Sequence, residues 1–131
     1  MIVGFNIEAL EASKGEGARG DLQVQYRPKI ENVEEATVSA IEGDVARIDF
    51  TFQVNYNTGD ETAATIEMEG NVLWKGGVEE LLEQWEDDES LPEKIEAPLM
   101  NDLYRKCLSQ AVGISDTLGL LPPIPTPRVD R

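Results

Sequence analysis

Residues 44–75, DVARIDFTFQVNYNTGDETAATIEMEGNVLWK, decide the fold, because apolar side chains fill every second position of two consecutive runs. The apolar positions are Ala46, Ile48, Phe50, Phe52, Val54 and Tyr56 in the first run and Ala64, Ile66, Met68, Val72 and Trp74 in the second. Successive side chains of a strand point to opposite faces, so each run predicts a strand with one apolar and one polar face. The polar residues 57–60 suit a tight turn, and we predict an antiparallel hairpin with strands at about 45–57 and 61–75.

Two earlier segments show the same alternation more weakly. Val3, Phe5 and Ile7 predict a strand at about residues 2–12, and Val24 and Tyr26 lie in a second one at about 21–33. The glycine-rich residues 13–20 are expected to form the loop between them, and Pro28 is expected to bend or end the second strand. Four strands in sequence predict an antiparallel meander with one apolar face.

Beyond residue 77 the apolar period changes from strand to helix. Val78, Leu81, Leu82 and Trp85 follow the i, i+3, i+4, i+7 spacing of a short helix at about 78–87. A longer helix is predicted at about 98–118, with Pro98 in its first turn, where the missing N–H costs little. It carries two adjacent apolar stripes, formed by Leu99, Leu103, Cys107 and Ala111 and by Met100, Tyr104, Leu108 and Val112.

Together these elements predict one α+β domain over residues 1–131, in which a short helix and a long carboxy-terminal helix cover a four-stranded sheet. At about 1.5 Å per residue the long helix would reach roughly 30 Å, enough to cross four strands. A proline-rich tail, residues 120–131, follows it and contains a Pro-x-x-Pro arrangement, for which packing against the fold is the favoured interpretation over partner recognition.

Charge restricts the partners. The chain has 11 basic and 26 acidic residues, a net charge of −15, which would repel nucleic acid and anionic membrane surfaces. A lysine-poor acidic surface also suggests a protein that works in high salt, because screening relieves the repulsion. The sequence shows neither a secretory signal nor an apolar run of the roughly 18 residues that a membrane span needs, so we expect a cytoplasmic location.

Catalytic and metal-binding patterns are weak. Histidine is absent, which removes the usual general base and the commonest zinc ligand. Gly15, Gly17 and Gly20 have the spacing of a dinucleotide-binding loop, but the loop leads into a strand and not a helix. The acidic residues 87–89 lack the spacing of a calcium loop, and Cys107 falls in an apolar stripe. We therefore predict no catalytic residue, no metal site, no cofactor and no enzymatic activity.

The order of these parts resembles SecB, the bacterial export chaperone. The segments that carry the resemblance are 47–56, 61–70, 98–112 and 120–125, which are similar to SecB's third strand, fourth strand, main helix and proline-containing tail. The ending, Leu-Pro-Pro-Ile-Pro before Pro-Arg-Val, is also similar to that of a group of uncharacterised archaeal proteins. If the source is archaeal, a motor partner of the SecA type is not assured.

The resemblance implies a holdase that assembles as a dimer or tetramer and binds non-native polypeptides in an apolar groove, without nucleotide or catalysis. The candidate groove residues flank the junction of the sheet, the short helix and the tail: Trp74, Leu81, Leu82, Trp85, Leu120, Leu121 and Ile124. The alternative is a scaffold subunit that uses the same fold to bind one folded partner. The surplus apolar width of the long helix fits either, since exposed apolar surface on a soluble protein marks an interface.

Overall fold

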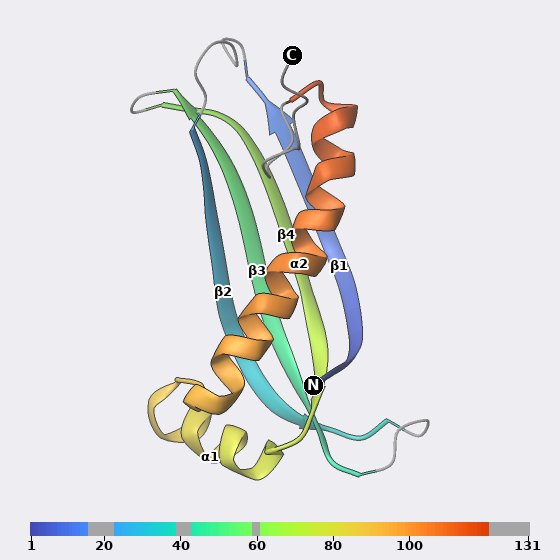
Figure 1. Ribbon diagram of the computed structural model, residues 1–131, viewed down its shortest axis with the longest axis vertical. Coiled ribbons are helices and arrows are strands. Elements are labelled where there is room, and N and C mark those ends of the chain that lie inside the picture. Colours follow the sequence, from blue (N-terminus) through green and yellow to red (C-terminus); the bar gives the residue numbers. More distant parts are fainter. Residues whose placement is uncertain (16–22, 39–42, 59–60, 121–131) are drawn as a thin grey trace, which may run out of the picture.

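The computed structural model describes residues 1–15, 23–38, 43–58 and 61–120. Four strands, β1 (Ile2–Lys14), β2 (Gln23–Ala36), β3 (Val45–Thr58) and β4 (Glu61–Lys75), form one antiparallel sheet. Two helices follow, α1 (Val78–Asp88) and α2 (Glu93–Thr117), and both lie on the same face of the sheet (Figure 1). The predicted α+β class, with a four-stranded antiparallel sheet and two helices, is confirmed.

The predicted meander order is wrong for one strand. The strands lie in the order β1-β4-β3-β2, so β2, β3 and β4 are consecutive neighbours while β1 pairs with β4. This is a Greek-key arrangement, in which a terminal strand crosses to the far edge. Alternation of side chains fixes which face each strand buries, but it does not say which strand lies beside which.

The edge strands are longer than predicted. β1 continues to Lys14, and β2 continues past Pro28 as far as Ala36. Pro28 pairs with Phe52 on an edge strand, where a missing N–H leaves no neighbour unsatisfied, so the expected end of the strand there does not occur. A register shift between Ile30 and Asn32 then bends β2.

The long helix begins earlier than the sequence predicted. α2 starts at Glu93, so Pro98 lies inside the helix and not in its first turn. Pro92 caps the helix instead, with its carbonyl accepting hydrogen bonds from the N–H groups of Ile95 and Glu96, both at 2.9 Å. Pro98 is exposed, and the helix tolerates its missing bond because Ile95 and Leu99 on either side are buried in the core.

α2 crosses the apolar face diagonally, from the β2 edge at its start to the β1 edge at its end (Figure 1). Its first stripe is fully buried and belongs to the core: Leu99, Leu103, Cys107 and Ala111, each at 0% exposure. Its second stripe is half-buried: Met100, Tyr104, Leu108 and Val112. The two predicted stripes therefore have different environments, and a diagonal helix leaves strips of the apolar face beside it.

The joint between β1 and β4 depends on a glycine. A side chain at Gly70 would place its Cβ 2.1 Å from the Asn6 carbonyl oxygen and 3.1 Å from the Ile7 Cα. Next to this close approach the register shifts between Ile7 and Ala9, which makes Glu8 an extra residue in β1. The bulge turns the Glu8 side chain toward the outer, helix-free face, where it contacts Arg47 and Asn71.

Candidate functional site

The strip of apolar surface between α2 and the β2 edge is the best candidate for a binding site. We call it the β2 margin, and it consists of Val24, Tyr26 and Ile30 of β2 and Met100, Tyr104 and Leu108 of α2. All six are half-buried and pack against the core. The Tyr104 ring meets those of Tyr26 and Phe52 edge-on, with centroids 6.1 and 5.4 Å apart. This geometry fixes the aromatic groups, and it leaves part of Tyr26 and Tyr104 to solvent while Phe52 is fully buried.

The opposite strip, between α2 and the β1 edge, is partly closed by charge. Phe5 stacks on Phe50 with ring centroids 5.7 Å apart, and the Lys106 ammonium lies 5.5 Å from the Phe5 centroid. The Lys14 ammonium donates a 2.8 Å hydrogen bond to the Leu118 carbonyl at the end of α2. Leu10 of β1 remains exposed to solvent, at 47%. The β2 margin is therefore the more continuous apolar surface.

The seven groove residues predicted from the sequence fall into three groups, which are buried, half-buried or outside the described residues. Trp74, Leu81 and Leu120 are buried in the core, at 5%, 0% and 8% exposure. Leu82 and Trp85, both on α1, are half-buried. Leu121 and Ile124 lie outside the described residues, as does the Pro-x-x-Pro segment. In this conformation only Leu82 and Trp85 of the described five offer much surface to a partner.

The residues of the β2 margin were missed as a site, although the signal for half of them was present. Met100, Tyr104 and Leu108 form the second stripe that makes the helix band wider than one sheet contact needs. Val24, Tyr26 and Ile30 could not be placed beside them, because a diagonal crossing of the helix is not encoded in periodicity.

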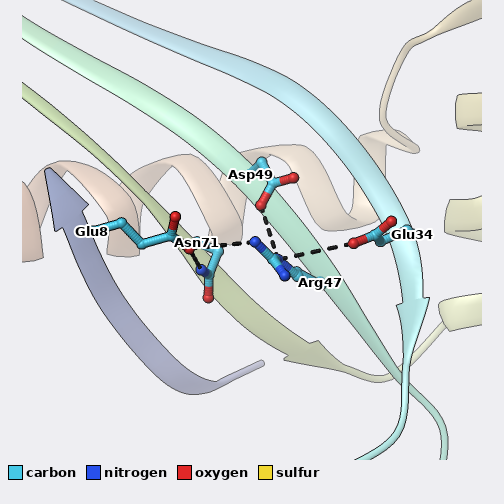
Figure 2. Close-up of polar contacts among 5 residues, drawn as sticks. All are labelled: Glu8, Glu34, Arg47, Asp49 and Asn71. Carbon is cyan, nitrogen blue, oxygen red and sulfur yellow. Dashed lines mark hydrogen bonds and ion pairs between the residues drawn. The ribbon is translucent and has the colours of Figure 1, made fainter.

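On the outer face of the sheet, Arg47 holds a group of carboxylates (Figure 2). Its guanidinium lies 3.0 Å from Asp49, 3.3 Å from Glu8 and 3.9 Å from Glu34. The Asn71 amide also donates to Glu8, so the group links all four strands. These contacts raise the pKa of Arg47, chiefly through the hydrogen bond to Asp49, and keep its charge in place.

Among the described residues, the side-chain contacts of this outer face are ion pairs and hydrogen bonds to carboxylates. An open hollow of about 460 Å³ beside Arg47 is lined by acidic side chains and by Phe50, Thr51 and Gly70. Among the described residues, no three histidine, cysteine or acidic side chains are arranged to hold a metal ion. Within the same residues, neither helix is both long and apolar enough to cross a membrane. Gly15 donates its N–H to the Ala63 carbonyl at 2.8 Å, and Gly17 and Gly20 lie outside the described residues.

Cys107 is a fully buried thiol on the sheet-facing stripe of α2. Burial raises its pKa from 9.0 to about 12, which suppresses the reactive thiolate. We expect an aromatic disulfide reagent at about pH 8 to label the native protein very slowly and the urea-unfolded protein at once. Rapid labelling of the folded protein would contradict a buried stripe.

The same shift has a consequence for stability. A cysteine that ionises less readily when folded stabilises the fold below pH 9.0 and loses that contribution as the pH rises toward about 12. Between these limits the free energy of unfolding of wild type should fall more steeply with pH than that of Cys107→Ala. Parallel pH profiles from urea unfolding would contradict this assignment.

No protein-family model matches the sequence, and the search of the curated proteins found no match. Among solved structures, the chain is similar to the SecB-like chaperone Rv1957 of Mycobacterium tuberculosis, in complex with a ChAD peptide from the Rv1956 HigA1 antitoxin. The match has a TM-score of 0.56 and 18% identity, and it covers 100% of this chain and 91% of that chain. At this identity the likeness concerns architecture alone: the chain has a SecB-like fold.

Proposed function

We propose that the protein is a holdase that binds non-native polypeptides through the β2 margin, without catalysis or cofactor. The observation that carries the proposal is the half-buried second stripe of α2, which lies beside half-buried residues of β2 and is covered by no strand of the described residues. Apolar and aromatic surface held rigidly at a groove is what an extended apolar segment needs for binding. The peptide complex of the SecB-like neighbour supports the same kind of ligand.

The proposal includes self-association in the cytoplasm as a dimer or tetramer, and stability that increases with salt. The net charge of −15 supports the salt dependence. Mass from light scattering at several protein concentrations tests the assembly. A strict monomer without affinity for unfolded protein would remove the proposal entirely.

The direct test compares one double variant and one single variant, which lie on opposite faces of the sheet. Met100→Gln with Leu108→Gln makes the β2 margin polar while keeping residues that favour helix. We expect the variant to lose at least about tenfold in affinity for a reduced, carboxymethylated model polypeptide, measured by fluorescence anisotropy, because apolar contact area is lost. Suppression of light scattering during refolding of an unfolded protein should fall in parallel.

The matched control is Leu73→Gln, a half-buried leucine on the outer face next to Gly4. It should bind the polypeptide like wild type. Equal affinity of all three proteins would argue against the β2 margin as the site.

The scaffold alternative predicts a different result. A single protein would then co-purify at fixed stoichiometry, and aggregation of unfolded proteins would proceed unchanged. We favour the holdase because the β2 margin is a long strip of mixed aliphatic and aromatic groups, a surface suited to varied extended segments.

A further inference from the structure

The short helix α1 lies at the end of the sheet where β4 leaves it (Figure 1). It contacts β2 and β3. Val78 and Leu81 are buried in the same core cluster as Val33, Ala46 and Trp74. Leu82 and Trp85 pack against that cluster and stay half-exposed. The amphipathic face of α1 is therefore a cover over part of the core.

Both ends of α1 are joined to the fold through left-handed backbone. Gly76 and Gly77 precede it with φ of +107° and +60°, and a Cβ at Gly76 would meet nothing within 4 Å. Glu89 follows it with φ of 56°, a conformation that costs a residue with a side chain about 1–2 kcal/mol. A hollow of about 470 Å³ beside Lys75, Gly76 and Gly77 leaves room at the entry to the helix. Few side-chain hydrogen bonds of the described residues fix these ends: the Trp74 indole N–H donates to the Gly76 carbonyl at 2.9 Å, and the Gln84 amide donates to the Ser90 hydroxyl at 2.8 Å.

The charges of α1 oppose its own helix. Six of its 11 residues are acidic and none is basic. Glu83 has four carboxylates three or four positions away, on Glu79, Glu80, Glu86 and Asp87, and each such pair repels on a helix surface. The acidic residues of the last turn also face the negative end of the helix dipole. No ion pair joins an α1 carboxylate to any described lysine or arginine.

We propose that α1 is a lid whose closure depends on ionic strength. At low salt, repulsion centred on Glu83 shifts the lid toward an undocked state. At high salt the Debye length falls to a few ångströms, so the repulsion between the carboxylates is screened. The helix is then stable, and its apolar face docks on the core. Opening exposes Trp74 and frees Leu81, Leu82 and Trp85, four of the groove residues predicted from the sequence. The link to client binding rests on the proposed function, whereas the lid itself does not.

Hydrogen exchange of the full chain, read by mass spectrometry, tests the lid without any client. Between about 1 M and about 0.1 M KCl, we expect the amides of residues 81–88 to lose at least about tenfold in protection, while those of 99–111 keep theirs. In Glu83→Lys, the four repulsions become attractions, and the protection of α1 at low salt should approach that of wild type at high salt.

The control is Glu61→Lys, which makes the same change in net charge at the exposed start of β4, away from α1. It should leave the salt dependence of α1 as in wild type. The proposal is overturned if α1 and α2 lose protection together, if α1 is equally protected at both salts, or if Glu61→Lys restores α1 as well as Glu83→Lys does.

A second arm measures binding of the carboxymethylated polypeptide at about 0.1 M KCl. Wild type and Glu61→Lys should bind at least about fivefold more tightly than Glu83→Lys, because the closed lid hides apolar surface. Equal affinities would overturn control of binding by the lid. Absence of binding by all three proteins would remove the proposed function, and the lid would then stand on the exchange result.

Discussion

Gly70→Ala is expected to detach β1 from the sheet. The new methyl carbon would lie 2.1 Å from the Asn6 carbonyl oxygen, and a backbone atom cannot turn aside as a side chain can. We expect a loss of about 3 kcal/mol or more in the free energy of unfolding, measured in urea. Amides of β1 should also lose exchange protection more than those of β3, because β4 is the only described strand that pairs with β1.

Gly113→Ala is the matched control, since the same methyl group is added on an exposed turn of α2 where nothing lies within 4 Å. It should raise the free energy of unfolding by about 0.5–1 kcal/mol, because alanine favours helix over glycine. If Gly70→Ala proved as stable as wild type, the close approach of β1 to β4 would be refuted.

Leu103→Ala and Leu108→Ala separate the two stripes of α2. Leu103 is fully buried, and its truncation should cost about 2–5 kcal/mol in the free energy of unfolding, because a cavity forms against the sheet. Leu108 is half-buried in the β2 margin, so the same truncation should cost about 1 kcal/mol and weaken polypeptide binding instead. Both losses follow from urea unfolding curves of purified protein.

Equal losses from the two truncations would mean that α2 is rotated about its axis relative to the sheet. The affinity for unfolded polypeptide tests the proposed binding role of Leu108 separately. Leu108→Ala should lower affinity for unfolded polypeptide, whereas a variant of Leu103 that remains folded should not, because Leu103 has no exposed surface.

The spacing of apolar residues predicted most of the strands and helices, because the two faces of each element have different solvent exposure. The alternation from Ala46 to Tyr56 matches an inner face whose six residues are all buried. The change of period after Gly77 matches the change from strand to helix at Val78. Such patterns record solvent exposure residue by residue, which is what burial selects.

The arrangement of the elements relative to one another could not be predicted from the sequence, because it depends on contacts between residues far apart in the chain. The position of β1 beside β4 depends on Gly70, whose role appears only when Asn6 is placed against it. The start of α2 at Glu93 shows the same limit, since proline signals a helix boundary only on average. The group of polar contacts around Arg47 includes Glu8 and Asn71, which lie far apart in the sequence and share no local motif.

The placement of β1 also sets a schedule for synthesis. β1 is made before the other three strands of the sheet. It can pair with β4 only after residues 61–75 have left the ribosome. Until then its backbone hydrogen-bonding groups have no native partner strand, and its apolar residues Ile7 and Leu10 lack their neighbours Gly70 and Met68. Closure of the sheet at this edge is thus a late step of long sequence separation, and a protein that we propose shields unfolded chains has itself to pass through such a vulnerable interval.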